Sequence, residues 1–220
     1  MESSLHYAIK EWYSKPGDKF ECRINNYIID IVRDNLLIEI QTKNFSAIKK
    51  KLKTLLKGDN EVRLMYPIAE LKWIVKMDKD NQKLIYKRKS PKKGTALDLF
   101  TELIRIPELI KRDNFSIEIL FIEVEEIRCD DGKGSWRRKG VSIKDRKLIE
   151  VKESILIKDK KDFLQFIPYN KRHIFSNKRL AKDLNIPVYK ARKLTYCLKK
   201  MGVIKQNGKR VNEHLFKVCV

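Results

Sequence analysis

The stretch from Tyr27 to Phe45, YIIDIVRDNLLIEIQTKNF, contains two runs of branched apolar residues separated by a short polar segment. Each run has the length of a buried strand. Each also carries one carboxylate, Asp30 in the first run and Glu39 in the second. Because a buried acid is costly unless something compensates it, this pattern raises the question of what the two carboxylates do.

The pair Asp34-Asn35 predicts a two-residue hairpin turn between the runs. The register that closes this turn brings Asp30 directly opposite Glu39, with Cβ atoms about 4.5–5.5 Å apart. Period-two alternation then puts Gln41 and Lys43 on the same face as Glu39. A register slip of one residue would separate the two acids.

Two opposed carboxylates in an apolar sheet are destabilising by themselves. A shared proton, a nearby Arg or Lys, or a divalent cation would each compensate them. Mg²⁺ prefers one or two carboxylates together with phosphate oxygens and water, which suits this arrangement. The alternative is a structural salt-bridge cluster that uses the abundant lysines.

An acid in an apolar strand, a tight turn and then IEIQ in a second strand resemble the core of the PD-(D/E)XK nuclease superfamily. The resemblance covers about residues 3–75, with a helix before the strands and the helix FSAIKKKLKTLL after them. It implies a restriction-endonuclease-like mixed sheet in an α/β fold. It also implies that Asp30 and Glu39 bind Mg²⁺ or Mn²⁺, and that Glu11 on the first helix adds a ligand or positions water.

Gln41 stands where the superfamily's motif has a lysine, a variant that some active members share. The role of that lysine is to orient the attacking water and to stabilise developing negative charge. The resemblance implies that this role passes to Lys43, or to Lys49 or Lys50 on the following helix.

The charge of the chain indicates a polyanionic partner. There are 50 Lys and Arg residues against 29 Asp and Glu, a formal net charge of +21. Such an excess favours nucleic acid, and DNA in particular for the proposed core. The alternatives are an anionic membrane surface and a composition that simply favours lysine. The four cysteines are scattered without a C-x-x-C pair, so neither a zinc site nor a disulfide framework is predicted.

Two domains are expected. Residues 1–157 alternate helical and strand patterns, which predicts a mixed α/β domain, and residues 158–220 form a smaller basic domain. No apolar run approaches 18 residues and the N-terminus has no signal-peptide pattern, so we expect a cytoplasmic protein without a membrane span.

The last 50 residues predict two helices joined by a tight turn, followed by a hairpin with Asn207-Gly208 at its turn. This order resembles a winged helix-turn-helix domain over residues 171–220. The resemblance implies a basic helix in a DNA groove and a basic wing on the backbone. The alternative is that this module packs on the other domain or on a partner chain. The candidate nucleic-acid contacts are Lys190, Arg192, Lys193, Lys199, Lys209 and Arg210.

Two further basic stretches are candidate nucleic-acid contacts. YKRKSPKKG, residues 86–94, includes Arg88, and its alternative is a solvated charged face. GKGSWRRKG, residues 132–140, sets Trp136 beside Arg137 and Arg138. The ring would stack on a base or sugar while the arginines hold phosphates. The alternative is that Trp136 folds back onto the core.

The resemblance to the nuclease core, together with the charge of the chain, implies a metal-dependent nuclease that hydrolyses phosphodiester bonds in DNA, with the C-terminal module adding affinity. Asp30 and Glu39 would hold the metal, and Gln41 would orient water. A homodimer would supply the two cuts that a duplex needs. The alternative function is a non-catalytic DNA-binding protein or transcriptional regulator on a degenerate nuclease fold.

Overall fold

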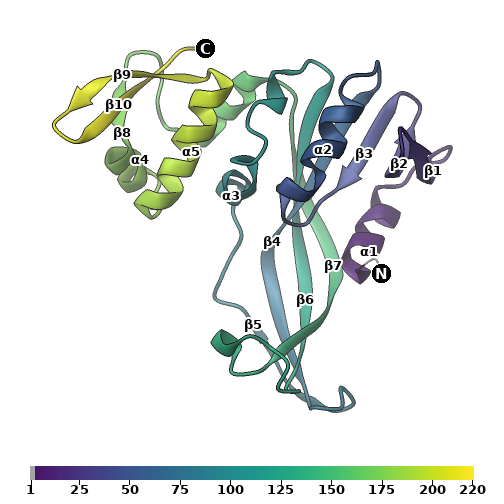
Figure 1. Ribbon diagram of the computed structural model, residues 1–220. Helices are drawn as coiled ribbons and strands as arrows, with labels where there is room; N and C mark the ends of the chain where they lie inside the picture. Colours follow the sequence, from purple (N-terminus) through teal and green to yellow (C-terminus); the bar gives the residue numbers. More distant parts are fainter. Residues whose placement is uncertain (1–2) are drawn as a thin grey trace.

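The computed structural model describes residues 3–220, so residues 1 and 2 of the predicted first domain lie outside the described part. The main sheet has the strand order β1-β2-β3-β4-β6-β7, with β5 paired to the second half of β4 (Figure 1). Its strands are β1 (Lys19–Ile24), β2 (Tyr27–Arg33), β3 (Leu36–Ile40), β4 (Glu61–Met77), β5 (Leu84–Lys89), β6 (Phe115–Cys129) and β7 (Ser142–Ile157).

The sheet is mixed in polarity. β3, β4 and β6 are parallel, and the pairs β1–β2, β2–β3, β4–β5 and β6–β7 are antiparallel. The parallel pair β3–β4 is joined by a crossover through a helix, as parallel strands require. The prediction of a mixed α/β fold is therefore confirmed.

Helices cover both faces of the sheet. On one face α1 (Ser4–Tyr13) packs with Leu5 and Ile9 against Ile38, Ile40 and Met65. On the other face α2 (Phe45–Leu55) and α3 (Leu99–Leu103) bury their apolar sides in a second, larger core. The acid-bearing hairpin β2–β3 thus lies between two helical layers.

Residues 96–111 are mostly not α-helical. Only α3 is, flanked by the 3-10 turns η1 (Ala96–Asp98) and η2 (Leu109–Lys111). Pro107 stands in the gap between α3 and η2 and cannot donate a helical hydrogen bond, which explains the break. The two other 3-10 turns are η3 (Trp136–Arg138) and η4 (Lys160–Phe166).

The C-terminal part contains β8 (Ile174–Ser176), α4 (Asn177–Asp183), α5 (Val188–Met201), β9 (Ile204–Arg210) and β10 (Glu213–Val218). The two helices, their short turn and the hairpin were expected, but the hairpin turn was placed wrongly. Arg210 pairs with Glu213, so the turn is Val211-Asn212. Gly208, with φ +107°, lies inside β9 where the register shifts, as a bulge requires.

The C-terminal unit is docked firmly on the rest of the chain. Leu99, Phe100 and Leu103 of α3 belong to one apolar cluster with Ala191 and Leu194 of α5. An ion pair of 2.7 Å between Lys190 and Asp98 adds a polar link between α5 and the segment just before α3. In Figure 1 the unit stands beside α3 at one end of the long strands.

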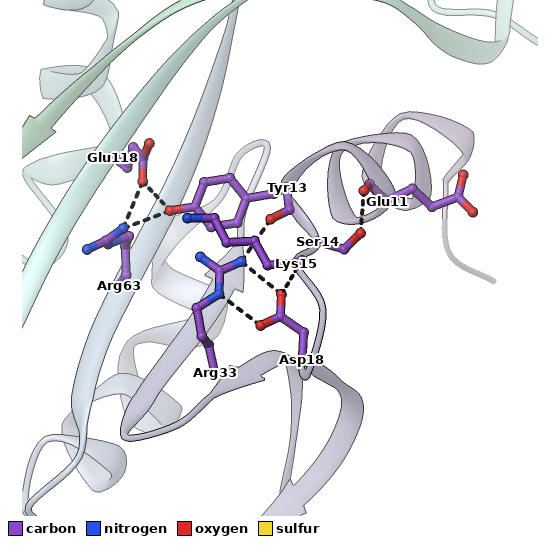
Figure 2. A network of polar contacts seen from close by, with 8 residues as sticks. All are labelled: Glu11, Tyr13, Ser14, Lys15, Asp18, Arg33, Arg63 and Glu118. Atoms are coloured by element: carbon purple, nitrogen blue, oxygen red, sulfur yellow. Dashed lines mark hydrogen bonds and ion pairs between the residues drawn. The ribbon is translucent and has the colours of Figure 1, made fainter.

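A buried polar network fixes the end of α1 to the sheet (Figure 2). The Tyr13 hydroxyl donates to Glu118 at 2.7 Å and accepts from Arg63 at 2.7 Å. Arg33 in the hairpin donates to the Tyr13 carbonyl at 2.8 Å and forms a two-point contact with Asp18. These contacts hold α1 and the β2–β3 hairpin in one fixed relation.

No helix among residues 3–220 has both the length and the apolar character that a membrane crossing demands.

We predict that Tyr13→Phe lowers the free energy of unfolding by about 2 kcal/mol, because it leaves a buried charged pair without its bridging hydroxyl. Urea unfolding followed by circular dichroism would measure this as a lower midpoint with an unchanged slope. Tyr86→Phe is the matched control, because no hydrogen bond involves the Tyr86 hydroxyl among residues 3–220. Equal midpoints for the two variants would contradict the role assigned to the network.

Candidate active site

The predicted hairpin register is confirmed from the turn to the pair Ile31–Ile38, one residue short of the two acids. Arg33 pairs with Leu36 and Ile31 pairs with Ile38, and Asp34 adopts the positive φ of +48° that the turn needs. The β2–β3 ladder ends there. Two residues beyond Ile38, the Ile40 N–H donates to the Asp30 carboxylate at 2.7 Å instead of to a backbone carbonyl.

The path of β2 changes at Asp30. Residues two apart on a regular strand share a face, but Ile29 packs in the core under α2 and Ile31 in the core under α1. The adjacent strand is irregular at the same level, where Glu21 has φ +52°. The Asp30 carboxylate therefore lies in the gap between β2 and β3 rather than on one face.

Two side chains that the sequence reasoning missed complete this site. His6 on α1 approaches Asp30, with 3.2 Å between Nε2 and Oδ2. Lys51 on α2 forms an ion pair with Glu39 and donates to the Ile28 carbonyl. The site thus draws residues from both helical layers onto the end of the hairpin.

The electrostatics of the two acids differ. Glu39 is 4% exposed, and its Oε1 receives no well-aligned hydrogen bond among the described residues, only the Lys51 ammonium against it. Burial and then the charge of Asp30 raise the pKa of Glu39 to about 7, although Lys51 acts in the opposite direction. Burial also acts to raise the pKa of Asp30, but hydrogen bonds from His6 and from Ile40 outweigh it and lower that pKa.

Asp30 and Glu39 offer oxygen ligands that suit a hard divalent cation. The buried Glu39 oxygen without an aligned donor and the adjacent charge of Asp30 both fit such an ion. Within residues 3–220, no three His, Cys, Asp or Glu side chains cluster in the manner of a fully protein-liganded metal site. A cation here would therefore keep water or substrate oxygens as its remaining ligands.

Gln41 follows the last residue of β3, and its backbone N–H still donates to the Met65 carbonyl of β4 at 2.9 Å. Its side-chain amide donates to the backbone carbonyls of Lys43 and Asn44, so it holds the turn into α2. Lys43 is exposed and lines a pocket with Thr42, Asp145 and Arg146. Because β3 ends at Ile40, the predicted period-two alternation does not extend to Lys43, and neither Gln41 nor Lys43 bonds to either acid among residues 3–220.

Glu11 is also not part of the site. It is exposed, and its carboxylate accepts a hydrogen bond of 2.6 Å from Tyr7 (its side chain extends away from the sheet in Figure 2). Glu11 is five positions along α1 from His6, so its side chain lies about 140° around the helix from the one that reaches Asp30.

The helix spacing could have identified Lys51. Ile48, Leu52 and Leu55 define the inner side of α2, and Lys51 falls among them at the spacing i, i+3, i+4, i+7. Lys49 and Lys50, the predicted alternatives, are exposed. His6 carried a weaker signal, its place next to the buried Leu5 on α1.

The predicted nucleic-acid contacts do not form one surface. Trp136 is 83% exposed, so the alternative that it folds back onto the core is wrong, and the Arg137 guanidinium lies 5.7 Å from its ring centre. Arg138 instead donates to the Val141 carbonyl at 3.0 Å. Arg88 lies on the fully exposed β5, 5.9 Å from the ring centre of Tyr86.

In the C-terminal unit most of the predicted contacts are open to solvent. Lys190 is engaged with Asp98 and Lys193 is half-buried. The exposed members are Arg192, Lys199, Lys209 and Arg210. This unit and β5 lie at opposite ends of the long strands (Figure 1).

Comparison with known proteins adds a family. Residues 3–158 match the family described as "Domain of unknown function (DUF8091)". The chain belongs to this family. A Treponema pallidum (strain Nichols) protein described as "Uncharacterized protein" is 34% identical over 165 residues, which span 74% of this chain. The chain covers less than two thirds of that relative, 65% of its length. No solved structure matches the chain.

We predict that without divalent cations the protein loses stability as pH rises from about 4.5 to about 7. The pKa of Glu39 is raised to about 7 in the folded state, so over this range the folded chain binds more protons than the unfolded chain. The loss amounts to at most about 3 kcal/mol. Urea unfolding in EDTA at several pH values would measure it.

Glu39→Gln should remove this fall in stability with pH. Glu126→Gln is the control: Glu126 is equally buried, but hydrogen bonds and ion pairs with Arg128, Lys72 and Arg146 outweigh burial and lower its pKa to about 2. This control should be less stable throughout the range yet retain the fall. An unchanged pH profile in Glu39→Gln would contradict the assignment.

Proposed function

We propose that the protein is a metal-dependent nuclease that hydrolyses phosphodiester bonds in DNA. One observation carries the proposal: Asp30 and Glu39 meet where β2 and β3 part, with the α2 lysine Lys51 against Glu39. An acid pair and a lysine at this point of a mixed sheet support the resemblance to the PD-(D/E)XK core. The helix–turn–helix–hairpin order supports the resemblance of the C-terminal unit to a winged helix.

In this proposal Asp30 and Glu39 hold Mg²⁺ or Mn²⁺. The ion supplies charge stabilisation at the scissile phosphate and lowers the pKa of a bound water. Glu39 must be ionised to serve as a ligand, and its raised pKa places this change close to neutral pH. The hydrogen bonds from His6 and Ile40 keep Asp30 ionised and oriented.

Lys51 takes the role that the superfamily gives to the lysine of its motif. Its ammonium lies beside Glu39, so it would orient the attacking water and stabilise negative charge on the phosphate as the bond breaks. Gln41 positions rather than reacts, because its amide holds the turn that leads into α2. Lys43 and Glu11 have no part in this mechanism.

DNA is the proposed substrate because the chain carries a net charge of +21 and exposed basic side chains on α5 and β9. Two copies of the chain would provide one cut for each strand of a duplex, so a homodimer remains part of the proposal.

A second candidate function is DNA binding without cleavage, as a regulator on a degenerate nuclease fold. It is favoured by Gln41, whose amide is turned to the Lys43 and Asn44 carbonyls, and by the Glu39–Lys51 ion pair, which already compensates one acid. The two candidates differ in a single measurement, cleavage of DNA in the presence of a divalent cation.

We predict that the protein cuts plasmid, linear or branched DNA with Mg²⁺ or Mn²⁺, and that Asp30→Asn and Glu39→Gln each reduce the rate at least about 100-fold. Lys51→Met should give a similar loss while DNA binding in EDTA is kept. Gel analysis of cleavage products over time would measure the rates.

Asp34→Asn is the matched control, since it makes the same chemical change at the exposed turn of the same hairpin, where φ is +48°. It should cut like the wild type. Wild-type protein that binds DNA but never cuts it would sink the nuclease proposal and leave the regulator. Cleavage that persists in both Asp30→Asn and Glu39→Gln would contradict the assignment of these two acids to the active site.

A further inference from the structure

Two helices of this protein carry no acidic residue, and they line the same groove. α2, FSAIKKKLKTL, has four lysines, and α5, VYKARKLTYCLKKM, has five cations. Lys49 and Lys53 of α2 form one side of the groove, and Tyr196 and Lys200 of α5 form the other. The chain between α3 and η2 makes its floor and adds Arg105 and Glu108.

Helix geometry explains why these side chains gather. Lys49 and Lys53 are four residues apart, so they lie one above the other on the same face of α2. Tyr196 and Lys200 have the same spacing on α5. The docking of α5 on α3 then holds the two cationic faces at the groove.

The cations of the groove are uncompensated. Among residues 3–220, none of Lys49, Lys53, Arg105 and Lys200 forms an ion pair, and Glu108 is the one acid beside them. On the two helices together, Lys51 and Lys190 are the two cations that the described residues pair with acids.

The end of the sheet that carries β5 differs from this groove in how its basic residues are paired. There several basic residues of β4, β5, β6 and β7 are paired with acids, whereas Arg88, Lys89 and Lys147 form no ion pair among the described residues. The pairs are Lys72–Glu126, Lys76–Asp130, Lys87–Glu125, Arg128–Glu126, Lys144–Asp131 and Arg146–Glu126.

Like charges held together without counter-charges repel one another, and this repulsion is relieved when a polyanion binds. Four cations spaced along a groove between two helices match a chain of phosphates better than a single small anion. The exposed ring of Tyr196, 44% accessible between the lysines, can contact a sugar or base.

We propose that the groove between α2 and α5 binds the phosphodiester backbone of a nucleic acid through Lys49, Lys53, Arg105 and Lys200. This inference rests on the nucleic-acid partner of the proposed function but not on cleavage. Lys51 points to the acid pair from the opposite side of α2, so a bound backbone would lie about one helix diameter, ~10–12 Å, from the site. The groove therefore links the C-terminal unit to the candidate active site.

The test is the salt dependence of binding to a fluorescently labelled DNA duplex of arbitrary sequence, measured in EDTA by polarisation so that no cleavage occurs. The wild type is compared with Lys49→Gln/Lys53→Gln. Loss of two phosphate contacts should reduce the slope of log K against log salt concentration by about 2 and weaken binding about 10-fold or more. Adding Lys200→Gln should reduce the slope further.

Lys50→Gln/Lys57→Gln is the matched control, because it removes the same charge from two exposed lysines, one on α2 and one just after it, that do not line the groove. Its slope should stay close to that of the wild type. Equal losses in the two double variants, no loss in either, or a wild type that does not bind would overturn the proposal.

The assay also separates this inference from the nuclease proposal. A protein that binds through the groove and never cuts DNA overturns the nuclease alone. Cleavage that depends on Asp30, together with binding that ignores Lys49 and Lys53, overturns the groove alone.

Discussion

The hydrogen bond from the Ile40 N–H to the Asp30 carboxylate holds the candidate site open. At this point a regular hairpin would pair backbone with backbone, and separating the strands would leave a buried N–H without a partner. The Asp30 oxygen fills that need, so β2 and β3 part at little cost. Their separation lets Asp30 face Glu39 and lets His6 and Lys51 approach from the two helical layers.

Two buried acids of this protein, Glu126 and Glu39, have surroundings that shift their pKa values in opposite directions. Around Glu126 it places Arg128, Arg146 and Lys72, and these cations outweigh burial and lower the pKa to about 2. Glu39 forms one ion pair, with Lys51, and burial and the charge of Asp30 outweigh it and raise its pKa to about 7. In a chain with 50 Lys and Arg residues, a second cation beside Glu39 would have been easy to provide. Of these two buried sites, the pair of Asp30 and Glu39 is therefore the one that a bound cation would stabilise more.

The hairpin register and the mixed sheet could be predicted from the sequence because the apolar pattern and the turn residues are local. The break at Asp30 could not, since it depends on a side chain that replaces a backbone partner and on α1 and α2, which lie elsewhere in the chain. Lys51 could have been predicted from the sequence, because it lies on the buried side of α2. The Asn207-Gly208 turn failed because the glycine serves a bulge instead.

The docked position of α5 limits how the C-terminal unit can act. Its inner side packs in the core through Ala191, Leu194 and Leu198, and Lys190 forms an ion pair with Asp98. A helix engaged in this way is not a free recognition element that a linker carries to distant DNA. What it still offers to solvent is a stripe that includes Tyr196 and Lys200 and continues onto α2. Because the shared core fixes the distance from that stripe to Asp30 and Glu39, it also determines which part of a bound backbone the acids can reach.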